Sequence, residues 1–277
     1  EYKINKSSFT NVPSWFMYFG DTIEGIGDLN GDGVEDIAVG NPVSYDGGVL
    51  NGAIWIMFLN TSGGVINEYK INESRFGNGN ELEGDVFGAS IANIGDLNND
   101  GVQDIAVGEP FSDDGGNDNG AVWILFLNNS GGVIDEYKIN ESRFGNGNEL
   151  DGGIFGSSIA NIGDLNNDGV QDIVVGEGRN DDGCGGTNCD NGAFWILFLN
   201  TSGGVIDEHK INESEFGNKD ELNGGWFGYR GISNIGDLNN DGVNEITVGE
   251  WWNDDGCGGT NCNQGAIWIM FFNSTEV

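Results

Sequence analysis

The sequence predicts an all-β protein, a β-propeller of four-stranded antiparallel blades. One segment of about 68 residues recurs four times, and each copy holds four short runs rich in Val, Ile, Phe and Trp, separated by Gly, Asn and Asp. Such runs are typical of antiparallel strands, and none shows a sustained helical period. A four-stranded sheet cannot bury its own faces, so the copies must stack, and radial stacking of such sheets gives a propeller.

The repeats are marked by one motif, Glu-Tyr-Lys-Ile-Asn, which begins at Glu1, Glu68 and Glu136 and returns at Glu208 with His209 in place of tyrosine. We therefore treat residues 1–277 as a single propeller domain of four repeats. The approximate repeat boundaries are 1–67, 68–135, 136–207 and 208–277.

The four strands of a repeat can be followed in the second copy. They are expected within 87–95, 105–108, 120–127 and 133–139. The apolar run Trp123–Leu127 predicts a strand buried on both faces, whereas alternation in 133–139 predicts a half-exposed outer strand. The tryptophans that recur once per repeat, Trp55, Trp123, Trp195 and Trp268, are expected in the core.

The repeat is out of phase with the ends of this sequence. It opens with a motif strand that has no preceding partner, and it closes after 266–272 without the strand that should follow. Because unpaired sheet edges are unfavourable, we expect the N-terminal strand to complete the last of four blades. That strand could belong to the same chain or to the next chain of a fibre or ring.

An acidic loop, Asp-x-Asn-x-Asp-Gly-x-x-acid, follows the first strand of every repeat. Alternate side-chain oxygens, a backbone carbonyl at the seventh position and a glycine for the sharp turn suit calcium, which takes six to eight oxygen ligands. A solvated turn is the alternative for one such loop, but four copies in register favour about four calcium ions. The predicted ligands are Asp28, Asn30, Asp32, Val34 and Asp36; Asp96, Asn98, Asp100, Val102 and Asp104; Asp164, Asn166, Asp168, Val170 and Asp172; and Asp237, Asn239, Asp241, Val243 and Glu245.

These motifs together carry a family resemblance. Phe87-Gly88, the acidic loop, Ala106-Val107-Gly108 and Gly120-Ala121 occur in an order that resembles the FG-GAP repeat of integrin alpha-chain propellers and related surface proteins. The resemblance covers essentially the whole chain and implies a calcium-binding β-propeller. It departs from integrins in blade number, since their propellers have seven blades and four repeats occur here.

Composition excludes some partners. The formal net charge is -35, so binding to nucleic acid or to an anionic membrane is disfavoured. No run approaches the roughly 18 apolar residues that a membrane helix needs, so we expect no membrane insertion.

Cysteines and sequons indicate an extracellular or cell-surface location. Two identical Cys-Gly-Gly-Thr-Asn-Cys segments predict the local disulfides Cys184–Cys189 and Cys257–Cys262, with a four-thiolate zinc site as the weaker alternative. Eight asparagines head Asn-x-Ser/Thr sequons and are candidates for glycosylation, although such residues also suit turns. They are Asn5, Asn60, Asn72, Asn128, Asn140, Asn200, Asn212 and Asn273.

The pattern favours binding over catalysis. The only histidine, His209, occupies the tyrosine position of an outer strand, and we identify no catalytic residues. Trp251, Trp252 and Trp226 fall outside the repeat pattern and are candidates for an interface or for stacking on sugars. We expect a structural or adhesive protein that contacts other copies of itself, a surface receptor or glycans. A lectin is the alternative, and a secreted polysaccharide hydrolase or lyase a more distant one.

Overall fold

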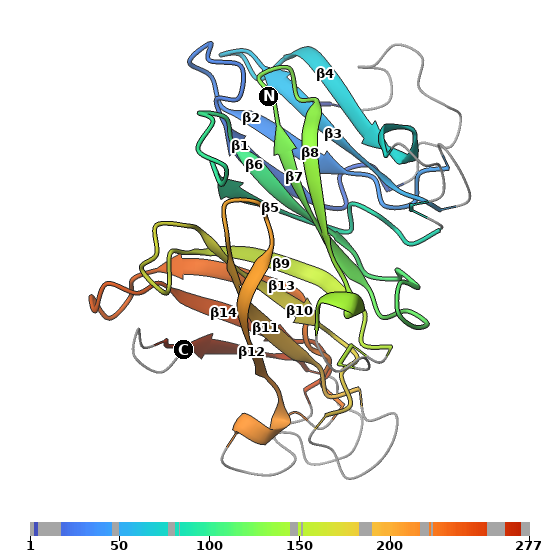
Figure 1. The fold of residues 1–277 in the computed structure, drawn as a ribbon, viewed down its shortest axis with the longest axis vertical. Helices are drawn as coiled ribbons and strands as arrows, with labels where there is room; N and C mark the ends of the chain where they lie inside the picture. Colours follow the sequence, from blue (N-terminus) through green and yellow to red (C-terminus); the bar gives the residue numbers. More distant parts are fainter. Residues whose placement is uncertain are drawn as a thin grey trace.

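The computed structural model describes residues 3–4, 18–45, 50–76, 81–82, 84–144, 149–150, 152–182, 190–216, 222, 224–253 and 264–272. Within them the chain forms four antiparallel sheets, blades 1 to 4, in which each strand pairs with the next along the chain (Figure 1). Blade 1 contains β1 (Ile23–Gly27), β2 (Asp36–Gly40), β3 (Ala53–Leu59) and β4 (Val65–Asn72), and blade 2 contains β5 (Ser90–Gly95), β6 (Asp104–Glu109), β7 (Ala121–Leu127) and β8 (Val133–Ile139). Blade 3 contains β9 (Phe155–Gly163), β10 (Asp172–Glu177), β11 (Ala193–Leu199) and β12 (Val205–Ile211), and blade 4 contains β13 (Phe227–Gly236), β14 (Glu245–Glu250) and β15 (Ala266–Met270).

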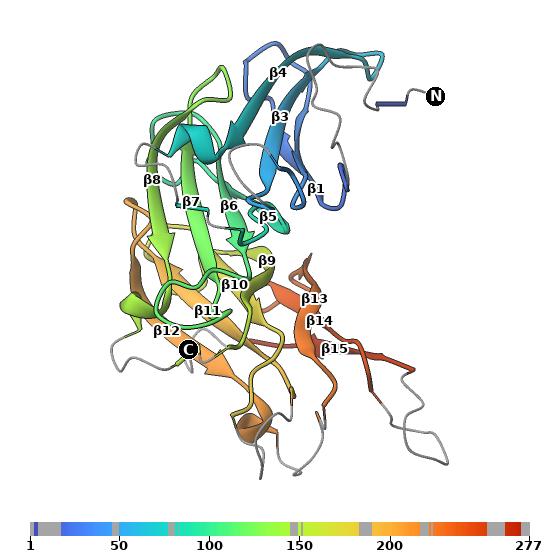
Figure 2. The same ribbon diagram turned by 90° about the vertical axis from the view of Figure 1, so that its right-hand side faces the viewer.

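The blades are arranged around a common centre. The first strands β1, β5, β9 and β13 lie nearest that centre, and the last strands β4, β8 and β12 lie outermost (Figure 2). The predicted all-β propeller of four blades is therefore confirmed. In the described ranges three short 3-10 helices follow the outer strands: η2 (Glu73–Arg75), η3 (Glu141–Arg143) and η4 (Glu213–Glu215). They were not predicted, because they are too short to show a period. No helix in the described part of the chain is long and apolar enough to cross a membrane.

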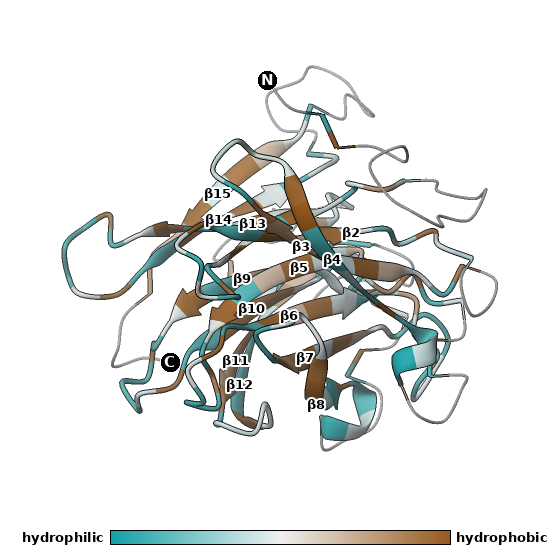
Figure 3. Ribbon diagram, turned by 90° about the horizontal axis from the view of Figure 1, so that it is seen from above, coloured by the Kyte–Doolittle hydropathy of each residue, from teal (hydrophilic) through white to brown (hydrophobic). Residues whose placement is uncertain are grey.

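Burial follows the sequence pattern within each blade. Every residue of β7 is buried, whereas β8 has exposed residues in its middle, as predicted. Figure 3 shows hydrophobic residues concentrated in the strands and hydrophilic ones in the connecting loops. Trp55, Trp123 and Trp195 are buried as expected, and Trp268 is partly buried against the core.

Blades join through two distinct faces. On the third strand, alternate side chains form a front face, which contacts the following blade, and the others form a back face, which contacts the preceding blade. In the first joint, Ile54, Ile56 and Phe58 of blade 1 pack in one cluster with Trp123, Leu125 and Leu127 of blade 2. Equivalent clusters join blade 2 to blade 3 and blade 3 to blade 4. Burying each such side chain contributes about 1.5–3 kcal/mol, so the joints stabilise the fold.

Glycines let adjacent blades touch backbone to backbone. A Cβ on Gly108 of blade 2 would lie 2.0 Å from the carbonyl oxygen of Gly156 in blade 3, and a Cβ on Gly120 would lie 2.1 Å from the carbonyl of Phe155. The same two contacts recur at the other in-chain joints, where Gly52 bridges Phe87 and Gly192 bridges Phe227. The Phe-Gly pair of one blade therefore fits against the glycines of the blade before it.

Blades 1 and 4, at the two ends of the blade series, each have one face that contacts no further blade in the described part of the chain. The described part of blade 4 has three strands, and β15 pairs with β14 alone. Of residues 1–17 the structure describes Lys3 and Ile4, and Ile4 packs against Val39, Trp55 and Met57 on the back face of blade 1. The expectation that the N-terminal strand completes blade 4 is therefore not met by the described part of that segment. That back face is apolar, and Ile4 and Phe19 are among the residues that pack against it.

Candidate functional site

The four acidic loops occupy equivalent places, each between the first and second strands of its blade. In the second loop, the Asp96 carboxylate accepts hydrogen bonds from the backbone amides of Asp100 (2.9 Å) and Gly101 (2.8 Å). The Asn98 side chain accepts from the Asp100 amide at 2.9 Å. Gly101 has a φ of +90°, which favours glycine and explains the invariant position in the repeat. The side chains thus wrap the turn that the sequence predicts.

The ninth residue of each loop is buried under the blade. Asp104 is fully buried and accepts hydrogen bonds from the amides of Leu97 (3.0 Å) and Leu127 (3.0 Å), so it ties the loop to the end of β7. Burial raises the pKa of Asp104 to about 6, although these amides favour the charged form. Asp36 and Asp172 make the same contacts, and burial raises the pKa of both.

In three of the four loops the seventh residue anchors the loop through its side chain. Val102, Val170 and Val243 pack against or within the apolar clusters between blades. A valine side chain has no oxygen, so the backbone carbonyl is the oxygen that this residue can offer to an ion.

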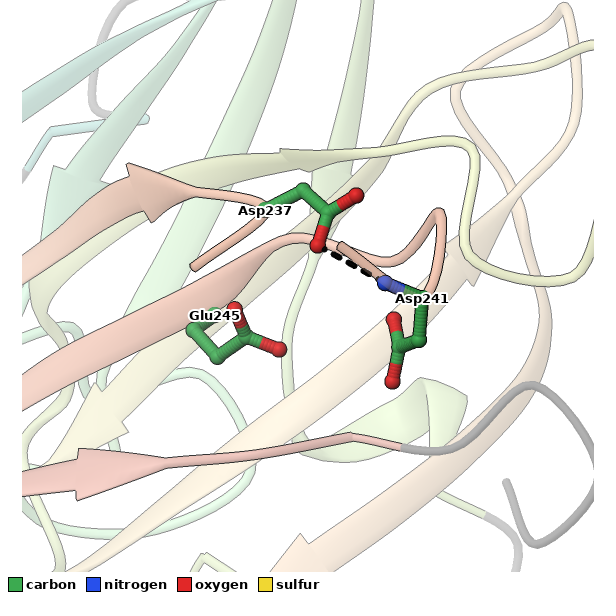
Figure 4. A group of neighbouring side chains, drawn as sticks. All are labelled: Asp237, Asp241 and Glu245. Atoms are coloured by element: carbon green, nitrogen blue, oxygen red, sulfur yellow. Dashed lines mark hydrogen bonds between the residues drawn. The ribbon is translucent and has the colours of Figure 1, made fainter. Parts of the chain in front are cut away.

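The fourth loop brings its carboxylates closest together. Oxygens of Asp237, Asp241 and Glu245 lie within 4.8 Å of one another, the only such group of three acidic, histidine or cysteine residues in the described ranges (Figure 4). Oxygen Oε2 of Glu245 accepts from the Leu238 amide, while Oε1 is buried and accepts no hydrogen bond. A buried carboxylate oxygen without a donor, on a side chain grouped with two further carboxylates, fits a divalent cation. Glutamate at the ninth position reaches further than aspartate, which explains why this loop differs.

The irregular tryptophans gather on blade 4 with Tyr229. Trp226 lies 4.4 Å from Trp252 between ring centroids, and Tyr229 stacks on Trp251 at 5.5 Å with an interplanar angle of 11°. Trp251 is 50% exposed and Trp252 39% exposed. We call these four residues the aromatic cluster. It borders a cavity that is also lined by Arg230 and Gln264, and the side chain of Arg179 lies over the Trp226 ring.

Sequence reasoning missed a buried charged network inside the blades. In blade 2, Lys138 contacts Glu109 at 2.9 Å and Asp114 at 2.7 Å, and the Trp123 indole donates to Glu109 at 2.9 Å. Lys210, Glu177, Asp182 and Trp195 repeat this arrangement in blade 3. In blade 4, Trp268 donates to Glu250. The Gly-Glu pair that ends the second strand in blades 2 to 4, together with the lysine of the repeat motif, was the signal that could have revealed it.

Other predicted residues have mixed outcomes. His209 lies exposed in β12, as expected. All four cysteines, and the sequon residues Asn5 and Asn273, fall outside the described residues. Asn60, Asn128 and Asn200 accept backbone hydrogen bonds within the turns after β3, β7 and β11, and Asn72, Asn140 and Asn212 accept bonds from the serines two residues on. These contacts fit the turn role that the sequence left open, while glycosylation remains a prediction.

Stacked antiparallel blades with an acidic loop in each define a propeller-repeat protein, and comparison with known proteins agrees. The model of the FG-GAP repeat matches residues 22–57, 87–125 and 155–197. The chain is 33% identical to integrin alpha-4 of Xenopus laevis over 161 residues, covering 57% of this chain and 14% of that protein. It is 33% identical to integrin alpha-11 of Homo sapiens over 162 residues (57% and 12%) and 35% identical to integrin alpha-6 of Gallus gallus over 152 residues (54% and 12%). The chain therefore carries FG-GAP repeats, and it is similar to integrin alpha chains over a small part of their length.

Proposed function

We propose that this chain is a structural or adhesive module that acts outside the cell or at its surface, is stiffened by calcium, and binds other copies of itself or a surface receptor. The observation that carries the proposal is that front-face side chains are buried at the joints between blades but exposed on blade 4. Front-face residues are buried in blades 1 to 3, whereas Ile267, Ile269 and Phe271 of blade 4 are 77%, 48% and 57% exposed. Apolar side chains exposed together mark a binding surface.

Calcium is the proposed cofactor, with one ion in each acidic loop. Asp237, Asp241 and Glu245 would hold it in the fourth loop, with Asn239 and the carbonyl of Val243. Calcium, when bound, supplies positive charge that offsets the repulsion of roughly 4 kcal/mol expected between two carboxylates about 4 Å apart at an effective dielectric of 20. The remaining loops offer the same donor types at the same positions.

The calcium proposal is tested by titration and melting. Equilibrium dialysis against calcium should give about four ions per chain, and chelation should lower the melting temperature, because an ion that binds only the folded state stabilises it. Fewer than one bound ion, or an unchanged melting curve in excess chelator, would contradict this part of the proposal.

Self-association is tested separately. Light scattering of the full chain in calcium, at increasing protein concentration, should show species larger than one chain, and electron microscopy should show whether they are fibres, rings or sheets. A single chain at every concentration would contradict self-association and leave a receptor as the proposed partner.

The aromatic cluster on blade 4 favours glycans as a second candidate partner. Exposed aromatic rings beside a cavity lined by arginine and glutamine resemble the mixture of stacking surface and polar groups that sugars require. A glycan array separates the two: selective binding that is lost in Trp251→Ala would favour a lectin. We propose no catalytic role, and the excess of carboxylates serves cations and solubility.

A further inference from the structure

The front face of blade 4 and the back face of blade 1 are the two halves of one inter-blade joint. We propose that they meet between two copies of this chain, so that copies assemble head to tail with the second copy continuing the blade series of the first. The inference rests on the proposed self-association and names its surfaces. Three joints inside the chain show what covers a front face, and each time it is the back face of another blade.

Side chains on the exposed face match those at the in-chain joints. Ile267, Ile269 and Phe271 stand where Ile54, Ile56 and Phe58 stand in blade 1. Those blade 1 residues are no more than 2% exposed. The opposite half is present at the start of the chain, where Val39, Trp55 and Met57 form an apolar back face. The same chemistry therefore occurs at both ends of the series.

The glycine contacts are also present as two separated halves. Gly88 of blade 2 would place a Cβ 2.9 Å from the Ala53 carbonyl of blade 1, whereas a Cβ on Gly20, its equivalent in blade 1, meets nothing within 4 Å. At the other end, Gly265 stands where Gly52 bridges Phe87, yet the nearest atom to its Cβ is the Trp251 carbonyl at 3.2 Å. Both halves of a fourth joint are thus built, and within the described residues they do not meet.

Strand pairing specifies how a second copy would fit. In blades 1 to 3 the third strand pairs with the repeat motif in one register, in which Trp55 is opposite Lys70, Trp123 opposite Lys138 and Trp195 opposite Lys210. The outer edge of β15 would receive the motif of the second copy in that register, with Lys3 opposite Trp268 and Ile4 opposite Ile267. Lys3 would then approach the buried carboxylate of Glu250, as Lys138 approaches Glu109. In this structure Lys3 is exposed.

Movement of the N-terminal segment accompanies assembly in this scheme. Ile4 packs against the back face of its own blade 1 in the single chain. When Ile4 pairs with β15 of a neighbour instead, the back face becomes available for the neighbour's front face. One displacement therefore frees both the donated strand and the surface that it covered.

Cross-linking two differently substituted chains tests the proposal. Ile4→Cys in one chain and Ile267→Cys in another are mixed in calcium and treated with a short bis-maleimide, and a covalent dimer is expected. Adding Phe271→Glu to the second chain should reduce the dimer yield at least about tenfold, equivalent to 1.4 kcal/mol. The matched control replaces Ile267→Cys by Ile134→Cys and should give no dimer. Ile134 lies on the outer strand β8 and is 56% exposed. Melting curves confirm that each variant folds.

Two outcomes would overturn the proposal. If the mixture gives no dimer while a chain carrying both cysteines is cross-linked as a monomer, the joint closes within one chain. If neither is cross-linked although light scattering shows assembly, copies associate through another surface, and the proposed self-association survives without this inference. Absence of any assembly would instead contradict the self-association on which the inference rests.

Discussion

Replacing Gly108 by alanine tests whether backbone contact between blades holds the propeller together. A Cβ at this position would lie 2.0 Å from the Gly156 carbonyl oxygen and 2.2 Å from the Ser90 hydroxyl oxygen. Ser90 donates a hydrogen bond to that same carbonyl at 2.7 Å. The Ser90 hydroxyl can rotate away, but the Gly156 carbonyl is backbone, so relief requires blades 2 and 3 to move apart.

The expected cost combines two effects. Overpacking costs about 1–3 kcal/mol, and loss of the buried hydrogen bond adds about 1 kcal/mol. A total of about 2–4 kcal/mol should lower the melting temperature of a chain of this size by roughly 5–15 °C. Thermal unfolding followed by circular dichroism at fixed calcium concentration measures this shift.

Gly25→Ala is the matched control. A Cβ at Gly25 meets nothing within 4 Å, and Gly25 is not among the glycines with positive φ. The same loss of unfolded-state entropy applies to both variants, so Gly25→Ala should be neutral or stabilise by up to about 1 kcal/mol. If the Gly108→Ala protein has the same melting temperature as the Gly25→Ala protein, the role assigned to the glycine contacts is refuted.

Three further predictions concern the loops, the buried network and the aromatic cluster. Glu245→Gln should remove about one calcium ion per chain in equilibrium dialysis and shrink the loss of melting temperature on chelation; unchanged stoichiometry would remove Glu245 from the ligands. Burial raises the pKa of Glu109 from 4.5 to about 7, although Lys138 lowers it. Between these two pH values the folded chain holds a proton that the unfolded chain releases. The stabilising contribution of Glu109 therefore falls as the pH rises from 4.5 to 7. Glu109→Gln should therefore flatten the pH dependence of urea unfolding in that window by up to about 1.4 kcal/mol per pH unit, and an unaltered slope would contradict the raised pKa. Trp251→Ala should abolish any glycan binding while leaving the melting temperature within about 2 °C of wild type, because this side chain is half exposed; Ile206→Ala, equally exposed on β12, should leave binding intact.

Much of the fold was predictable because local and global signals agree. Strands such as β7 and β8 are specified by burial patterns that repeat in each copy, and the positions of Gly101 and Asp96 identify the acidic turn without reference to any neighbour. The sequence could not show which hydrogen bonds each carboxylate oxygen of the acidic loops accepts. Asp104 was expected as a ligand, and only the fold shows that its carboxylate also bonds two amides, one of them at the end of β7.

The sequence by itself determined the repeat, the strand order within a blade and the residue types of the four acidic loops, since these depend on periodicity and turn chemistry along the chain. Only the tertiary structure decided which faces meet, because contacts such as Gly108 with Gly156 and Lys138 with Glu109 join residues distant in sequence. It also decided that Ile4 lies on blade 1 and that the front face of blade 4 is exposed. A repeat pattern specifies each half of a joint, but whether the two halves meet depends on the packing of the blades in space.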